Sequence, residues 1–340
     1  MRIIVMGTGP FAVPTCRELL SAGHDVPLVV TRPLAQPRPK KIPPRPVFDW
    51  ARENSLEIFE PASINDPQAI AKLAEYHPDL FFVCDYGQIL SKDCLSVPRL
   101  GGINLHGSLL PRHRGAAPVQ WTLLQGDELA GVTVIHMTPG LDAGPALAQE
   151  SLVIAPDETA EQLEPRLAEA GVAASLRSIE LLSGWDGKAV LGELQDKSLV
   201  TRAPRFTKAD GQLDFRHPAQ QLVRRVRACQ PWPGTFAELT WPEGKRLRLL
   251  IRAARCVETL PPLADAAPGC ALAIDASELD STTAGQRNWS APWNKLIAVA
   301  CSEGTFLIAR LQPAGKREMV TAEFLRGHPL SPGARFLLPQ

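Results

Sequence analysis

Short apolar segments alternate with helical patterns through the first 140 residues, and this alternation constrains the fold more than any other feature of the sequence. A helix between two apolar strands lets the strands pair in parallel, with helices covering both faces of the sheet. The chain therefore predicts a doubly wound α/β sheet of parallel strands. The predicted strands are 2–6, 26–30, 80–84, 103–105 and 132–137, and the predicted helices are 11–20, 66–76, 118–124 and a long one that begins near 159.

The second half of the chain has a different pattern. After residue 206, short apolar or alternating runs at 236–239, 247–251, 271–274, 296–300 and 305–311 are separated by turn residues, which is typical of a small β barrel. A chain of 340 residues exceeds one average domain of roughly 150 residues. We therefore expect a first domain at 1–183, a linker at 184–205 and a second, barrel domain at 206–340. Pro165 lies in the early turns of the long helix, so the helix is expected to begin late or bend.

Composition excludes several classes of protein. Seven scattered cysteines without C-x-x-C spacing argue against a disulfide framework and a zinc site, and no metal is expected. No apolar stretch approaches the roughly 18 residues of a membrane span, and residues 1–6 lack the apolar core of a signal peptide. We expect a cytoplasmic monomer without membrane contact.

The turn Gly7-Thr8-Gly9-Pro10-Phe11-Ala12 matches the G-x-G-x-x-A pattern of dinucleotide-binding proteins. Pro10 removes one of the N–H groups that such a turn offers to a pyrophosphate, and the second strand ends without the acidic residue that holds a ribose hydroxyl. Arg32 is the one residue there that would suit an NADP phosphate. The pattern therefore favours a tight β-α turn over an NADP-dependent oxidoreductase.

The candidate chemistry lies in 102–118. Asn104 and His106 alternate on an apolar strand, so both side chains point to one face at the carboxyl edge of the sheet, where α/β proteins bind ligands. Asp142 lies in a glycine-flanked turn just past the strand predicted at 132–137. If the two strands are neighbours, an amide, an imidazole and a carboxylate converge.

Such a set suits acyl transfer between two amines. Asn104 would donate a hydrogen bond to the developing oxyanion, His106 would stabilise it or shuttle protons, and Asp142 would orient the imidazole. No activated Ser or Cys is evident, which favours direct transfer over an acyl-enzyme. Each residue taken alone is more often structural, and the role of His113 in the same loop stays open.

The sequence resembles the methionyl-tRNA formyltransferase family over nearly its whole length. The stretch from Asn104 to Pro118 and the later Asp142 match the pattern shared by enzymes of this fold that use 10-formyltetrahydrofolate, and they indicate the reaction class. The opening turn and the block Leu311-Gln312-Pro313-Ala314-Gly315-Lys316 narrow the acceptor to charged tRNA. Further matches are Tyr86-Gly87-Gln88-Ile89-Leu90 and Pro231-Trp232-Pro233.

The resemblance implies a Rossmann-like catalytic domain at 1–183 and an OB-like tRNA-binding domain at 206–340. It also implies roles for individual residues. Asn104, His106 and Asp142 would be catalytic, and the substrates would be 10-formyltetrahydrofolate and initiator Met-tRNA. The folate would contact Ser108, Leu109, Leu110 and Pro111, with Tyr86, Gly87, Gln88, Ile89 and Leu90 lining its pterin pocket.

The sequence departs from the family pattern at several sites, of which the proline-rich loop after the second strand is the largest. Gly9 precedes Pro10 where the family has Pro directly after Gly-Thr, and Asp85 replaces a small residue before Tyr-Gly. Ala143 and Pro145 also replace the usual Thr and Asp around the turn of Asp142.

Two basic segments are candidates for tRNA contacts. The proline-rich segment 32–46 carries Arg38, Lys40 and Lys41, which align with the family's basic loop, although its glycine is replaced by Pro39. In 245–255, Arg246 and Arg248 alternate with leucines, which places the cations on one face of a strand. Both segments could contact tRNA phosphates, or be solvated surface.

Two other functions remain as alternatives. A relative that formylates a small amine such as an amino sugar nucleotide is disfavoured by the opening turn and the carboxyl-terminal block. A catalytically silent RNA-binding protein is disfavoured because binding alone needs no Asn, His and Asp at that spacing.

Overall fold

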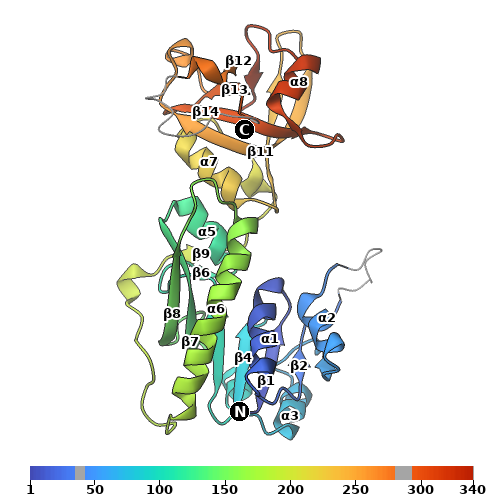
Figure 1. Ribbon diagram of the computed structural model, residues 1–340, viewed down its shortest axis with the longest axis vertical. Coiled ribbons are helices and arrows are strands. Elements are labelled where there is room, and N and C mark those ends of the chain that lie inside the picture. Colours follow the sequence, from blue (N-terminus) through green and yellow to red (C-terminus); the bar gives the residue numbers. More distant parts are fainter. Residues whose placement is uncertain (35–42, 280–292, 340) are drawn as a thin grey trace. The chain divides into compact units, whose positions relative to one another are not determined.

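The structure is a computed structural model that describes residues 1–34, 43–279 and 293–339. The chain folds as two compact units, whose elements are labelled in Figure 1. The first unit comprises Met1–Thr122, Asp127–Ala155 and Gln162–Arg205, and the second comprises Leu123–Gly126, Pro156–Glu161 and Phe206–Gln340. The segment 184–205, predicted as a linker, therefore packs with the first unit.

The first unit is built on a seven-stranded sheet with the order β3-β2-β1-β4-β5-β7-β8. The strands β1, β2, β3, β4 and β5 are parallel, and the segments between them contain helices, as the alternating pattern predicts. The strands are β1 (Ile3–Gly7), β2 (Val29–Val30), β3 (Ile58–Phe59), β4 (Leu80–Cys84), β5 (Gly102–His106), β7 (Leu129–His136) and β8 (Ala146–Val153). The helices are α1 (Val13–Ser21), α2 (Pro46–Glu53), α3 (Pro67–Glu75), α4 (Lys92–Leu95), α5 (Pro118–Gln125) and α6 (Ala160–Ser183).

The expectation of an entirely parallel sheet is wrong for its last two strands. β7 pairs antiparallel with β5, and β8 pairs antiparallel with β7. After β5, no crossover carries the chain back to the edge of the sheet at which β5 begins. β7 therefore starts near the edge at which β5 ends and runs in the opposite direction. The predicted neighbourhood of the two strands is nevertheless observed, since Asn104 lies opposite Ile135 and His106 opposite Thr133.

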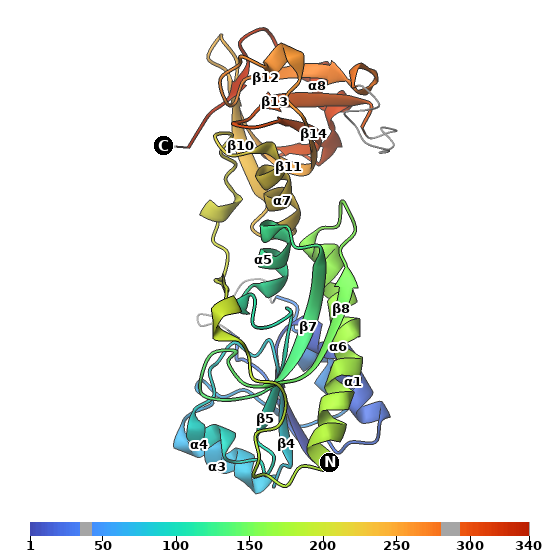
Figure 2. The same cartoon turned by 90° about the vertical axis from the view of Figure 1, so that its left-hand side faces the viewer.

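Helices cover both faces of this sheet. Figure 2 shows α1 and α6 on one face and α3 and α4 on the other. The second face buries Ile4, Met6, Phe81 and Val83 against Leu73 of α3 and Cys94 of α4. On the first face, a Cβ at Gly171 of α6 would lie 2.7 Å from Leu105, so the absence of a side chain lets the helix approach β5 closely. α6 runs from Ala160 to Ser183 with Pro165 inside it, so of the two expectations, a late start or a bend, the late start is wrong.

The second unit is an antiparallel sheet with the order β12-β13-β14-β11-β10-β16, and β15 pairs with β14. A bridge between Cys270 and Arg335 joins the segment before β12 to β16, so the two ends of the sheet meet as in a small barrel. The strands are β10 (Thr235–Thr240), β11 (Arg246–Val257), β12 (Ala271–Asp275), β13 (Lys295–Ala300), β14 (Thr305–Pro313), β15 (Met319–Val320) and β16 (Arg335–Phe336).

Two helices of the second unit were not predicted from the sequence. They are α7 (Ala219–Ala228), which buries Leu222 and Val226 in the barrel core, and α8 (Thr321–Gly327), which buries Phe324 there. The short strands β6 (Arg114–Gly115) and β9 (Arg202–Ala203) pair within the first unit. Among the described helices, none combines the length and the apolar character that crossing a bilayer would require.

Candidate active site

Asn104 and His106 lie on β5, and both line a cleft of about 620 Å³ in the first unit. Asp142 lines the same cleft from the loop that joins β7 to β8. Its other walls include Thr8–Phe11 and Tyr86–Leu90, which follow the carboxyl ends of the parallel strands β1 and β4, and Met137–Leu141, which follows the antiparallel β7. The three predicted catalytic side chains therefore meet in one cleft at the predicted edge of the sheet.

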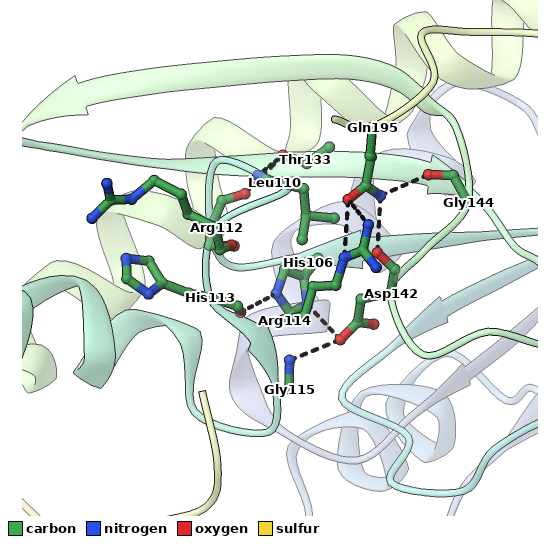
Figure 3. Close-up of polar contacts among 11 residues, drawn as sticks. His106, Leu110, Arg112, His113, Arg114, Gly115, Thr133, Asp142, Gly144 and Gln195 are labelled. Carbon is green, nitrogen blue, oxygen red and sulfur yellow. Dashed lines mark hydrogen bonds and ion pairs between the residues drawn. The ribbon is translucent and has the colours of Figure 1, made fainter. Parts of the chain in front are cut away.

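His106 is buried, and both ring nitrogens face defined oxygen atoms. Its Nε2 lies 2.9 Å from the backbone carbonyl oxygen of His113, and its Nδ1 lies 3.8 Å from Oδ2 of Asp142 (Figure 3). A carbonyl oxygen only accepts hydrogen bonds, so Nε2 carries a proton. Nδ1 is therefore the ring nitrogen that faces the Asp142 carboxylate.

Asp142 is fixed by backbone geometry and by a hydrogen bond. Its φ is +49°, a left-handed conformation that is uncommon for a residue other than glycine. Its Oδ2 accepts a hydrogen bond of 2.9 Å from the N–H of Gly115. A Cβ at Gly115 would lie 2.5 Å from the carbonyl oxygen of Ala203, so a glycine is needed where β6 approaches β9. Asn104, by contrast, makes no side-chain hydrogen bond to any residue in 1–34, 43–279 or 293–339, so its amide is available to a ligand.

Gln195 holds the turn of Asp142 from the segment predicted as a linker. Its Nε2 donates hydrogen bonds of 2.9 Å to the carbonyl oxygen of Asp142 and 2.7 Å to that of Gly144. Its Oε1 accepts hydrogen bonds from the guanidinium of Arg114 at 3.1 and 2.7 Å (Figure 3). The sequence carries no signal for this role, because a lone glutamine in a weakly patterned segment has no periodicity to place it.

Replacing Gln195 with glutamate is expected to lower kcat/KM about tenfold. Glutamate keeps the acceptor for Arg114 but loses the two donors that fix the carbonyl groups of Asp142 and Gly144, and each lost hydrogen bond is worth roughly 1 kcal/mol. The comparison is steady-state kinetics of Gln195→Glu against wild type, with Gln68→Ala on the exposed face of α3 as the control. Wild-type kinetics for Gln195→Glu would show that the turn is held by other contacts.

His113, whose role the sequence left open, supports His106 through its backbone. Its ring is buried, and the ring Nε2 lies 2.7 Å from Oδ2 of Asp127. Its backbone N–H donates a hydrogen bond of 2.8 Å to the hydroxyl of Thr201. Arg112 also pairs with Asp127 at 2.6 Å. These contacts fix the carbonyl group that accepts the hydrogen bond from His106.

Burial lowers the pKa of His113 below its ordinary value of about 6.5, and the pairing with Asp127 offsets only part of this shift. In the window just below pH 6.5 the unfolded chain binds more protons at this residue than the folded chain. The free energy of unfolding should therefore fall as pH is lowered through this window. Urea denaturation from pH 7.5 to 5.5 should show a smaller fall for His113→Asn than for wild type or for the exposed-residue control His217→Asn; equal slopes for all three would contradict this expectation.

The predicted folate contacts divide into two groups. Tyr86, Gly87, Gln88, Ile89 and Leu90 all line the cleft, and Ile89 is 68% exposed there. The residues of 108–111 are not among the lining residues. Ser108 and Leu110 are buried, and the Ser108 hydroxyl donates to the carbonyl oxygen of Arg112, so this stretch shapes the loop behind the cleft. The structure therefore brings only the first group to the cleft.

Of the predicted tRNA contacts, the structure describes Arg246 and Arg248, and both are exposed on β11. Arg248 stacks over the ring of Phe236, with its Cζ 3.8 Å from the ring centre, and Arg246 lies 3.8 Å from Glu238. Arg38, Lys40 and Lys41 lie outside the described residues.

Comparisons with known proteins extend over the whole chain. A formyl transferase family model matches residues 1–179, and a formyl transferase C-terminal domain model matches residues 205–329. A methionyl-tRNA formyltransferase of Rhodopirellula baltica is 44% identical, covering 100% of this chain and 97% of its own length. One of Methylococcus capsulatus is 41% identical, covering 97% of this chain and 98% of its own length.

Solved structures share the fold at low sequence identity. A sugar 3N-formyl transferase, WlaRD, superposes with a TM-score of 0.59 at 14% identity, covering 93% of this chain and 99% of its own. HypX from Aquifex aeolicus in complex with tetrahydrofolic acid has a TM-score of 0.56 at 15% identity and covers 98% of this chain, which spans 48% of HypX. The two family models and the identity to full-length relatives show that the chain belongs to the methionyl-tRNA formyltransferase family.

Proposed function

We propose that this protein transfers the formyl group of 10-formyltetrahydrofolate to the amino group of methionyl-tRNA and so supplies the formylated initiator tRNA for translation. The names of its full-length relatives support this acceptor over an amino sugar nucleotide. The observation that carries the chemistry is the convergence of Asn104, His106 and Asp142 in one cleft, with Nδ1 of His106 facing the carboxylate.

The proposed mechanism assigns a role to each side chain. Attack of an amine on a formyl carbon develops negative charge on the formyl oxygen, and the available amide of Asn104 would donate a hydrogen bond to it. When protonated, His106 would add positive charge beside that oxygen, with its Nδ1 facing the Asp142 carboxylate. Because Nε2 is bound to the carbonyl of His113, the ring keeps one orientation while Nδ1 exchanges its proton.

10-Formyltetrahydrofolate supplies the formyl group, and the cleft fits its flat, partly polar ring system. Val83, Leu90 and Ile135 give apolar walls, while the backbone of 86–90 offers hydrogen-bonding groups. The volume of about 620 Å³ lies within the usual range of small-molecule sites. We assign the folate contacts to Tyr86, Gly87, Gln88, Ile89 and Leu90, with 108–111 shaping the loop beneath.

The acceptor can be tested directly. Purified protein is incubated with labelled 10-formyltetrahydrofolate and either methionyl-tRNA or an amino sugar nucleotide, and the transfer of label is followed. We expect product with the tRNA alone. Transfer to the sugar nucleotide with none to the tRNA would refute the proposal.

Arg246 and Arg248 are proposed to contact tRNA phosphates from the second unit, and Arg38, Lys40 and Lys41 from the first. Arg248→Ala should raise KM for tRNA several-fold and lower the slope of log affinity against log salt by about 1, because one phosphate contact is lost. Binding is measured at several salt concentrations, with Arg326→Ala, an exposed arginine of α8, as the control. An unchanged salt slope for Arg248→Ala would remove Arg248 from the tRNA interface.

We also propose that the protein acts as a cytoplasmic monomer. The side chains assigned to the reaction, Asn104, His106 and Asp142, line one cleft of a single chain. Sedimentation at the concentrations used for kinetics should give the mass of one chain, 36.9 kDa. A stable dimer would contradict the monomer.

A further inference from the structure

Asp85 is a carboxylate in the cleft that the roles assigned above do not use. It directly follows β4, whose residue Cys84 pairs with Gly7 of β1 and whose residue Val83 pairs with Asn104 of β5. This register places Asp85 at the carboxyl edge of the central strand, between the turn after β1 and the end of β5 at His106. Asp85 is exposed within the cleft, in the same lining as Asn104 and His106.

Gly9 provides the space for this carboxylate. A Cβ at Gly9 would lie 2.9 Å from Oδ2 of Asp85, closer than side-chain carbons approach such atoms. Gly9 has φ −83° and ψ 170°, a backbone conformation that any residue can adopt. The glycine is therefore required by the lack of space for a side chain and not by its backbone conformation. Gly9 and Asp85, two of the positions at which this sequence departs from the family pattern, are therefore in contact.

The structure gives Asp85 no evident structural role. Its carboxylate accepts no hydrogen bond from the part of the chain that the structure describes, whereas the carboxylate of Asp142 is bound by Gly115. Its φ of +50° is in the left-handed region, which costs a residue other than glycine roughly 1 kcal/mol or more. An aspartate that is held at such a cost, and whose charged group is turned to a cleft, is best explained by a ligand.

The groups around Asp85 favour a cation as that ligand. Glu164 of α6 and Asp142 line the same cleft, and burial together with the charge of Asp85 raises the pKa of Glu164. Asp85 keeps an exposed surface toward the cleft, but the surrounding walls desolvate its carboxylate and raise its pKa, while the charge of His106 on β5 opposes this shift. The nearby cations are Arg205 in the cleft lining and Arg32, whose guanidinium lies beside Gly87. A carboxylate with a raised pKa is a stronger proton acceptor than an ordinary one.

We propose that Asp85 is a catalytic residue that binds the α-ammonium group of methionyl-tRNA and accepts its first proton. This proposal rests on the function proposed above. The ammonium gives one proton to the Asp85 carboxylate, and the neutral nitrogen then forms its bond to the formyl carbon. The bond from that carbon to N10 of the folate breaks, the second proton lost by the nitrogen ends on N10, and Asp85 releases its proton to water.

The central experiment is the pH dependence of kcat/KM for methionyl-tRNA at saturating 10-formyltetrahydrofolate. Asp85→Asn should be impaired about a hundredfold at pH 6, and the defect should shrink toward pH 9. An α-amino group has a pKa of roughly 7.7–8, so at high pH the amine arrives deprotonated and needs no acceptor on the protein. Asp93→Asn, at an exposed carboxylate of α4, should follow the wild-type profile.

A binding measurement separates this role from a folate contact or a fold defect. Calorimetric titration with 5-formyltetrahydrofolate should give Asp85→Asn the affinity of wild type. A defect that is equal at every pH, a loss of folate affinity, or unchanged kinetics would each overturn the assignment. If the wild-type protein formylates no methionyl-tRNA, the proposed function fails. If wild type is active and only Asp85→Asn departs from the expected behaviour, the role of Asp85 alone fails.

The contact with Gly9 gives a second, independent test. Gly9→Ala should displace the carboxylate and lower kcat/KM at pH 6 about tenfold, because the end of a side chain moves more easily than backbone. In the background of Asp85→Ala, the same Gly9→Ala change should have no effect, since the clashing atoms are gone. Equal effects of Gly9→Ala in both backgrounds would show that the glycine does not serve Asp85.

Discussion

Replacing His106 with alanine is expected to lower kcat by about a thousandfold or more while leaving the fold intact. The change removes the imidazole that faces Asp142 in the cleft and hence the charge that would stabilise the formyl oxygen, and losses of this kind are typically 10² to 10⁴ in rate. Single-turnover transfer to methionyl-tRNA measures the loss, and circular dichroism checks the fold.

A matched substitution separates the loss of this ring from the loss of any histidine. His217→Ala, at an exposed position of the second unit, should retain wild-type turnover. His106→Ala should also keep its affinity for 5-formyltetrahydrofolate, because the proposed folate contacts lie at 86–90. Turnover by His106→Ala near the wild-type rate would leave the proposed mechanism without its central group.

Replacing Gly144 with alanine is expected to destabilise the protein by about 3 kcal/mol and to reduce kcat about a hundredfold. The new Cβ would lie 1.8 Å from the carbonyl oxygen of His136, where backbone cannot move cheaply. The loss of unfolded-state entropy on Gly→Ala substitution favours the folded state by only about 0.4–1 kcal/mol, so the clash dominates. The strained turn would also displace Asp142, and a shift of about 1 Å near reacting groups costs roughly 10² in rate.

Chemical denaturation and steady-state kinetics test both effects. Gly184→Ala is the control, because a Cβ at Gly184 meets no atom within 4 Å and the residue is exposed. It should be neutral or slightly stabilising. Equal stability of Gly144→Ala and Gly184→Ala would mean that the backbone at His136 yields more easily than its contacts suggest.

Much of the fold follows from local pattern. The strand at Leu80–Cys84 has the predicted bounds, and the helices at Pro67–Glu75 and Pro118–Gln125 lie within about one residue of the predicted ranges, because continuous apolar runs and helical spacing are local signals. The short β3 and the antiparallel β8 were not predicted. β8 alternates half-buried and exposed residues at the edge of the sheet, so it lacks the apolar run that identifies the inner strands.

The site was predicted only where its residues share an element or a motif. Asn104 and His106 follow from strand alternation, and Asp142 from the glycines that flank it. Gln195 lies 53 positions from Asp142, and no local pattern signals a hydrogen bond across that distance. The segment that carries Gln195 has few buried side chains, which is why the sequence alone suggested a linker.

The sequence by itself determined the alternation of strands and helices, the change to a β barrel after residue 206, and the chemical groups available at the edge of the sheet. Only the tertiary structure decided that β7 runs antiparallel, that His113 serves His106 through its carbonyl group, and that Gly9 makes room for Asp85. The physical reason is the sequence separation over which each signal acts. Periodicity reports which face of one element is buried, whereas these contacts depend on the direction of a connection and on the separation of backbones that only packing brings together.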